Sequence, residues 1–159
     1  KMEKILISGV AADKNVAKIR VAGLGNDPES TFRLLNLLDR NNLNIDVMIQ
    51  SLGKDGTKSV SFTVAKPDML RTIDVLNDNK DLLGIKKLDY DENVAKISVI
   101  GAGVRSHSGV AAKMFGALAN AGINTEMVTT SEIRITALID EAYADQAMRA
   151  IHETFLERV

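Results

Sequence analysis

Residues 41–51 read NNLNIDVMIQS, and residues 121–131, which lie 80 positions later, read AGINTEMVTTS. In both stretches apolar side chains alternate with polar ones, which is typical of a half-buried β-strand. Both also carry a carboxylate, Asp46 in the first stretch and Glu126 in the second, that a plain strand does not need. A chain that contains the same half-polar strand twice is expected to contain an internal repeat.

Similarity between the two copies extends along the whole chain. Four pairs of segments match, and with their offsets they are AKIRVAGLG at 17–25 with AKISVIGAG at 95–103 (78), RLLNLLDRNNLNID at 33–46 with KMFGALANAGINTE at 113–126 (80), SVSFT at 59–63 with EIRIT at 132–136 (73), and RTI at 71–73 with RAI at 149–151 (78). The changing offsets predict two extra residues in the first loop of the second copy and a central hairpin seven residues shorter. Such length changes belong in loops, where they cost little.

Hydrophobic periodicity predicts the same element order in both copies. In the first copy the expected elements are a strand at 17–24, a helix opened by Asp27-Pro28, a strand through 45–49, a turn at 53–56, a return strand at 60–64, a helix from 66 and a strand at 85–90. In the second they are a strand at 95–101, a helix at 108–121, strands at 123–130 and 132–139, and a helix at 142–156. This β-α-β-β-α-β order predicts the α+β class with two ferredoxin-like units.

The second copy lacks a final strand, whereas the chain begins with an unassigned strand, KILISGV at 4–10. We expect this strand to fill the vacant edge of the second sheet, with Ile5 and Ile7 buried, because an open edge promotes aggregation. The first unit, residues 15–92, would then be inserted into the second, which consists of residues 1–14 and 93–159.

Composition excludes several classes of function. The net charge is −1 and no basic stripe is present, so nucleic acid is not an expected partner. Only 4% of the residues are aromatic, which argues against the base-stacking RNA-binding domain of the same topology. The two histidines, His107 and His152, lie on different predicted elements, so no metal, no cofactor and no catalytic residue is expected. The absence of cysteine is compatible with the cytosol, and the apolar runs are too short to span a bilayer.

The glycine-rich stretch GAGVRSHSG at 101–109 joins a predicted strand to a predicted helix. It is compatible with a dinucleotide-binding loop, a plain strand–helix turn, or backbone N–H groups that bind a carboxylate or phosphate. The Asp46/Glu126 and Glu132/Arg134 pairs are compatible with acid–base groups or with a solvated surface. Together the polar groups suit a small zwitterion, and they are Asn44, Asp46, Gln50, Asn124, Glu126, Thr130, Ser131 and Glu132.

The stretch KISVIGAGVRSHSGVAAKMFGALANAGINTEMVTTSEIRITALI closely resembles the C-terminal ACT domain of bacterial aspartokinase, with GAGVRSHSGV and TTSEIRI as its most specific motifs. VAADKNVAKIRVAGLGNDPES, continuing to NLNIDVMIQS, resembles the ACT domain that precedes it. The resemblance covers residues 4–156 and implies tandem ACT domains without a kinase domain. It also implies the regulatory subunit, starting at Met2, or the excised regulatory half, of an enzyme (EC 2.7.2.4) that phosphorylates aspartate and is inhibited by lysine, threonine or both.

The resemblance further implies effector sites and partners. One pocket would use Asn26, Asp27, Glu29, Ser30, Thr31, Gln50, Ile123 and Asn124, and the other Asp46, Ser106, His107, Ser108, Gly109, Val110, Thr130, Ser131 and Glu132. The expected partners are the catalytic aspartokinase subunit or domain and a second copy of the chain, in the cytoplasm. The alternatives are a free-standing ACT sensor that acts on another enzyme or regulator, and a small phosphatase of the acylphosphatase kind, which Arg105 alone supports.

Overall fold

The computed structural model describes residues 6–102, 104 and 108–156 of the 159-residue chain. The chain divides into two compact units, Asn15–Glu92 and Lys1–Lys14 with Asn93–Val159. We call the first the middle unit and the second the terminal unit, after their positions in the sequence. Two long strands, β1 (Leu6–Leu24) and β4 (Lys87–Ala102), contribute residues to both units.

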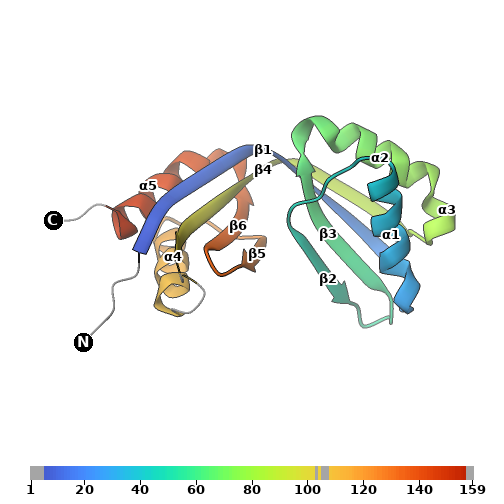
Figure 1. Ribbon diagram of the computed structural model, residues 1–159, viewed down its shortest axis with the longest axis horizontal. Coiled ribbons are helices and arrows are strands. Elements are labelled where there is room, and N and C mark those ends of the chain that lie inside the picture. Colours follow the sequence, from blue (N-terminus) through green and yellow to red (C-terminus); the bar gives the residue numbers. More distant parts are fainter. Residues whose placement is uncertain (1–5, 103, 105–107, 157–159) are drawn as a thin grey trace. The chain divides into compact units, whose positions relative to one another are not determined.

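The middle unit contains a four-stranded sheet and its helices (Figure 1). Besides its parts of β1 and β4, the elements are α1 (Pro28–Arg40), β2 (Met48–Leu52), β3 (Lys58–Ala65), the 3-10 turn η1 (Lys66–Asp68), α2 (Met69–Asp78) and the short α3 (Lys80–Leu83). The strand order is β2-β3-β1-β4, and β3 runs antiparallel to both β1 and β2. This is the ferredoxin-like arrangement that the element order predicts.

The core of the middle unit follows from the alternation along its strands. Ile19 and Val21 of β1 are fully buried, whereas Arg20 between them is only partly buried. Phe62 of β3 lies opposite Ile19 in the sheet register and is also fully buried. The helices contribute apolar residues at helical spacing, and Leu34 of α1 and Leu76 of α2 belong to the same buried cluster.

The terminal unit repeats this plan. Besides its parts of β1 and β4, it contains α4 (Ser108–Asn120), β5 (Met127–Thr130), β6 (Arg134–Asp140), the 3-10 turn η3 (Glu141–Tyr143) and α5 (Ala144–Phe155). The strand order is β1-β4-β6-β5, and β6 runs antiparallel to both β4 and β5. Ile97 and Ile135 from the sheet, Met114 from α4 and Ile151 from α5 are buried in one core cluster.

The first residues of β1 occupy the edge next to β4 in the terminal unit. The Ser8 hydroxyl donates a hydrogen bond to the backbone carbonyl of Ile100 at 3.2 Å. Ile7 and Val10 pack against the core of this unit. Ile5, which we also expect to be buried, lies outside the described residues. The N-terminal residues therefore supply the strand that the second repeat lacks at its own end.

The prediction of separate strands at 4–10 and 17–24, and at 85–90 and 95–101, is wrong. Each pair is one continuous strand, of 19 residues in β1 and of 16 in β4. The intervening residues, AADKNV at 11–16 and DENV at 91–94, contain no glycine or proline to break an extended backbone.

Several element boundaries also differ from the predicted ones. β5 starts at Met127 rather than at 123, although the Glu126 N–H still donates to the Leu138 carbonyl at 2.8 Å. β2 likewise starts only at Met48. The last predicted helix begins as a 3-10 turn, since Asp140 Oδ1 accepts from the Ala142 N–H and holds the first turn tight.

The strand register corrects the alignment of the second half of the repeat. Phe62 pairs with Ile19, and Ala137 pairs with Ile97, so Phe62 corresponds to Ala137 at an offset of 75. The buried residues Met69, Thr72 and Leu76 correspond to Ala144, Ala147 and Ile151 at the same offset of 75. The central hairpin of the second copy is therefore five residues shorter (80 − 75 = 5), not seven.

The two wrong segment matches have a physical explanation. A shift of two residues keeps every strand side chain on its original face, so SVSFT and EIRIT match in pattern although they are out of register. A shift of three residues is close to one helical turn, which explains the match of RTI with RAI. In both cases the periodicity is the same before and after the shift.

Candidate ligand-binding sites

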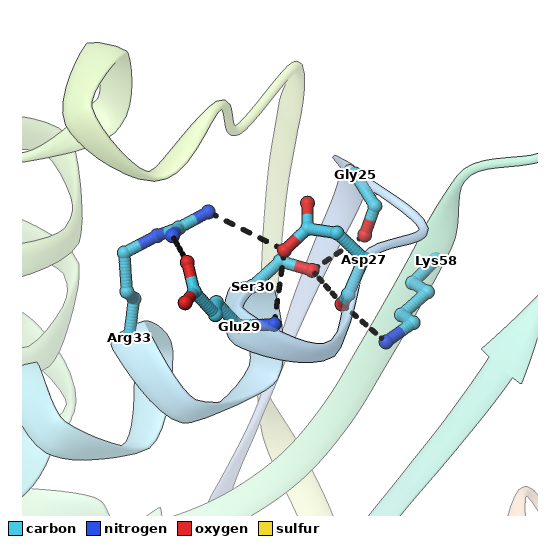
Figure 2. Close-up of polar contacts among 6 residues, drawn as sticks. All are labelled: Gly25, Asp27, Glu29, Ser30, Arg33 and Lys58. Carbon is cyan, nitrogen blue, oxygen red and sulfur yellow. Dashed lines mark hydrogen bonds and ion pairs between the residues drawn. The ribbon is translucent and has the colours of Figure 1, made fainter.

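The first candidate site lies where β1 leads into α1 in the middle unit (Figure 2). Asp27 caps the helix, since its Oδ1 accepts a hydrogen bond from the Glu29 N–H at 2.9 Å. Pro28 follows as the first helical residue, where its fixed φ favours the helix and its missing N–H costs nothing. This local sequence therefore determines where the helix starts.

Side-chain donors satisfy the carbonyl groups of this loop. The buried Ser30 hydroxyl donates to the carbonyl of Gly25 and, at 3.2 Å, to that of Asp27. Lys58, at the start of β3, donates from Nζ to the Asp27 carbonyl at 3.0 Å. A Cβ on Gly25 would lie 2.8 Å from Asp27 Oδ2, so this position requires glycine unless the aspartate moves. The loop is thus held from the helix, from β3 and by its own backbone.

Arg33 gathers two carboxylates on the first turn of α1. Its Nη1 lies 3.1 Å from Glu29 Oε1, and its Nη2 lies 3.6 Å from Asp27 Oδ1, as Figure 2 shows. These side chains are well exposed, so the pairs add at most about 1 kcal/mol to stability. The two carboxylates also place hydrogen-bond acceptors, which suit a cation such as an ammonium group, at the N-terminus of α1.

A side-chain hydrogen bond ties α1 to the edge strand β2. The Thr31 hydroxyl donates to Gln50 Oε1 at 2.5 Å. This bond brings together two residues that the sequence analysis assigns to one pocket, although they are 19 positions apart. Asn26 is exposed in the same loop. Within the middle unit, therefore, the predicted residues Asn26, Asp27, Glu29, Ser30, Thr31 and Gln50 gather at one end of α1.

The second candidate site lies in the terminal unit and uses the turn between β5 and β6. The Ser131 N–H donates to the Arg134 carbonyl at 2.8 Å, and the Ser131 hydroxyl approaches the same oxygen at 3.5 Å. Thr130, Ser131 and Glu132 are exposed, as are Ser108 and Gly109 at the start of α4. The predicted residues Ser106 and His107 lie outside the described residues.

Two predicted apolar residues have side chains that are not available to a ligand. Val110 is fully buried and Ile123 is 5% exposed, and both belong to the core of the terminal unit. They can contact a ligand only through their backbones. Ile123 and Asn124 belong to the terminal unit and Asp46 to the middle unit. Their predicted roles in pockets that combine residues of both units therefore stay predictions.

The two candidate sites differ chemically although they are repeats of each other. At the offset of 80, Ser30 corresponds to Val110, and Thr31 corresponds to Ala111. Since alanine has no hydroxyl, the Thr31–Gln50 bond has no counterpart in the terminal unit. At these two positions the first site therefore has hydroxyl groups, and the second has apolar side chains.

The structure adds three residues that the sequence analysis missed, namely Gly25, Arg33 and Lys58. Gly25 and Arg33 had a local signal, since both flank the capped start of α1. Lys58 had none, because only the pairing of β1 with β3 brings it to the Asp27 carbonyl. Within the described ranges, no group of three His, Asp or Glu side chains is placed to hold a metal ion. None of the described helices combines the length and hydrophobicity needed to span a membrane.

Replacing Asp27 by alanine should lower the free energy of unfolding by about 1 kcal/mol, because the helix loses its cap. Asp27→Asn is the matched control, since it removes the same charge beside Arg33 but keeps the Oδ1 acceptor. Urea unfolding of both variants measures the difference. Equal losses in the two variants would show that the charge, and not the cap, stabilises this helix.

Comparisons with known proteins agree with this geometry. A sequence model described as an ACT domain matches residues 97–155. A chain from the crystal structure of aspartokinase alpha and beta subunits is 41% identical, with a TM-score of 0.87 over 94% of this chain and 98% of that chain. The ligand-free regulatory subunit of aspartate kinase from Thermus thermophilus is 32% identical, with a TM-score of 0.89 over 94% of this chain and 99% of that chain.

This chain belongs to the family of aspartate kinase regulatory subunits. Its fold is the ACT-type, ferredoxin-like α+β fold, and it corresponds to the regulatory part of the enzyme. The aspartokinase of Pseudomonas aeruginosa is 37% identical over 154 residues, which are 97% of this chain but 37% of the relative. The aspartokinase of Helicobacter pylori is 39% identical over 98% of this chain and 38% of its own length. The chain thus spans little more than a third of these curated relatives.

Proposed function

We propose that the chain binds lysine, threonine or both, and passes this signal to the catalytic part of aspartate kinase as feedback inhibition. The observation that carries the proposal is the polar end of α1 in a chain of this regulatory family. An amino acid needs acceptors for its ammonium group and donors for its carboxylate. The carboxylates of Asp27 and Glu29 supply the acceptors. The side-chain NH₂ group of Gln50 supplies the donor, and the Thr31 hydroxyl orients this amide by donating to its Oε1.

The proposal includes two tandem ACT domains, Asn15–Glu92 and Lys1–Lys14 with Asn93–Val159, each with its own site. The chemical difference between Thr31 and Ala111 supports unequal affinities of the two sites for one amino acid. The proposal requires that the effector binds one conformation of the chain more tightly than another, because only such a difference lets a ligand shift a conformational equilibrium. We place the protein in the cytoplasm as part of the same proposal, in keeping with its lack of cysteine.

Calorimetric titration of the chain with lysine and with threonine tests this function. We expect saturable binding of at least one of them, and no binding of norleucine, which has the chain length of lysine without its side-chain ammonium. Titration of the catalytic part with the loaded chain then distinguishes the proposal from a sensor that acts on another enzyme. If neither amino acid binds, the effector assignment is wrong.

Replacing Ser131 by phenylalanine should weaken effector binding by roughly 1–3 kcal/mol, because the bulky ring fills an exposed turn and removes a polar partner. Ser131→Ala is the control, since it removes the hydroxyl without adding bulk and should have the smaller effect. The free energy of unfolding should change little, because Ser131 is exposed. If Ser131→Phe binds the effector as tightly as the unmodified chain does, Ser131 is not part of the effector site and serves only the turn between β5 and β6.

We also propose that the chain forms a homodimer through its ACT sheets and that the effector tightens this dimer. The strand order ends with β2 in the middle unit and with β5 in the terminal unit. Leu52 on β2 is 61% exposed and Val128 on β5 is 41% exposed, and edge strands of this kind tend to pair. Sedimentation velocity should show a dimer whose dissociation constant falls when effector is added. A monomer under both conditions would contradict the proposal.

A further inference from the structure

The middle unit contains a hollow of about 520 Å³ whose lining includes none of the residues assigned to the candidate effector sites. Its walls come from the end of β1, the turn between β2 and β3, the first residues of β3, and Lys86 just before β4. Arg20 and Ala22 line it, and both alternate with the buried Ile19 and Val21. The hollow therefore opens on the face of the sheet opposite the core of this unit.

The charge of the hollow is predominantly positive. Arg20, Lys54 and Lys86 line it together with one carboxylate, Asp55. Arg20 pairs with Asp89 at 3.6 Å, and Lys87 lies 3.9 Å from the same carboxylate. Four cations and two carboxylates thus leave a net charge of +2 (4 − 2) in and beside the hollow. Within the described part of the chain, Lys54 makes no ion pair.

The backbone holds Lys86 at this place. The strand register shifts between Ala22 and Leu24, and Gly23 at this shift has a φ of 87°. A Cβ on Gly23 would lie 2.5 Å from both Cβ and Cγ of Lys86, so the lysine stem crosses directly over the glycine. The Lys86 N–H also donates to the Ala22 carbonyl at 2.9 Å. The backbone and the first stem carbons of Lys86 therefore have a defined place beside Gly23.

The carboxylate of the hollow is already engaged. Asp55 Oδ1 accepts from the Thr57 N–H at 3.0 Å and from the Thr57 hydroxyl at 2.8 Å. These bonds, with a smaller contribution from the charge of Lys86, hold the pKa of Asp55 below its ordinary value. Asp55 therefore shapes the turn that carries Lys54, while its charge offsets only part of the positive charge nearby.

We propose that this hollow binds a small dianion, either a phosphate or a dicarboxylate, between Lys54, Lys86 and Arg20. Its volume is in the range of small-molecule sites, roughly 300–1,000 Å³. None of the described residues that line it is aromatic, so a nucleobase would have no stacking partner. The hydroxyls of Thr57 and Ser59 add short-range donors to the positive charge. A compact anion fits this lining better than a nucleotide.

Titration of the ¹⁵N-labelled chain tests the proposal, with inorganic phosphate in one series and succinate in another. Sodium chloride keeps the ionic strength constant, so that screening does not change. We expect saturable amide shifts at Gly23, Gly53, Thr57 and Lys86 with at least one of the two probes. The probe that binds identifies the ligand as phosphate or dicarboxylate. Shifts that grow linearly without saturation in both series would overturn the proposal.

Charge variants make the test specific to the hollow. Lys54→Gln and Lys86→Gln should each weaken binding by roughly 3- to 10-fold, because each removes one nearby positive charge. Asp55→Asn keeps the Oδ1 acceptor for Thr57 and removes a negative charge, so it should tighten binding. Lys113→Gln is the control, because it changes the net charge of the chain by the same amount as Lys54→Gln or Lys86→Gln. Lys113 is exposed on α4 in the terminal unit, so this substitution should have no effect on anion binding. If Lys113→Gln weakens binding as much as Lys86→Gln, the interaction is with overall charge and the site assignment is wrong. The result of this test is independent of effector binding, since neither lysine nor threonine is a dianion.

Discussion

Replacing Phe62 by alanine should lower the free energy of unfolding of the middle unit by about 3–5 kcal/mol. Phe62 has an exposed fraction of 0% and is the largest side chain in the core of this unit. It lies opposite Ile19 on one neighbouring strand and opposite Met48 on the other. Truncation would leave a cavity that these strands cannot close without breaking their register. Urea unfolding, followed by amide hydrogen exchange along β3, measures the loss.

Phe32→Ala is the matched control for this substitution. Phe32 lies on α1 and is 65% exposed, so removal of its ring leaves no cavity in the core. Its change in the free energy of unfolding should stay within roughly 0.5 kcal/mol, because surface positions tolerate substitution. Equal losses in the free energy of unfolding for the two variants would show that Phe62 does not stabilise the core more than an exposed side chain does.

Removal of residues 1–10 should destabilise the terminal unit and make the chain aggregate. Ile7 and Val10 pack against the core of this unit, and their loss removes roughly 2–4 kcal/mol of hydrophobic stabilisation. The deletion also removes the part of β1 that lies beside Ile100 of β4, and an open edge of this kind invites pairing between chains. Light scattering and urea unfolding, followed through the amides of β6, report the two effects.

Ser8→Ala is the control for the deletion. It removes only the hydrogen bond to the Ile100 carbonyl on an exposed side chain, so the variant should stay monodisperse and nearly as stable as the unmodified chain. A soluble deletion variant with an unchanged terminal unit would show that the first residues of β1 do not support that unit. This outcome would also count against our proposal that residues 1–14 belong to a second ACT domain.

The helix start in the candidate site of the middle unit was predictable because its signal is local, whereas the choice of Glu29, Ser30 and Thr31 as site residues came from the family resemblance. Asp27-Pro28 indicates a capped helix start, and the helix brings Glu29, Ser30 and Thr31 with it. Gln50 entered the prediction as one of the polar groups that suit a zwitterion, and only the family resemblance assigned it to the same pocket as Thr31. Its bond to Thr31 depends on the packing of α1 beside β2, which no local pattern encodes. The hollow around Lys86 gave no sequence signal at all, because its walls come from four separate segments.

Local sequence patterns predict the order of strands and helices within each unit, the faces of these elements that are buried, and the start of α1. These follow from the period of 2 in strands, the period of 3.6 in helices and the chemistry of caps, all of which act over a few residues. Only the tertiary structure decided that β1 and β4 are continuous, and that Phe62 corresponds to Ala137. A strand shifted by two residues keeps its buried face, so the sequence pattern is equally compatible with both registers. The hydrogen bonds and side-chain packing between β1 and β3, and between β4 and β6, select one of them.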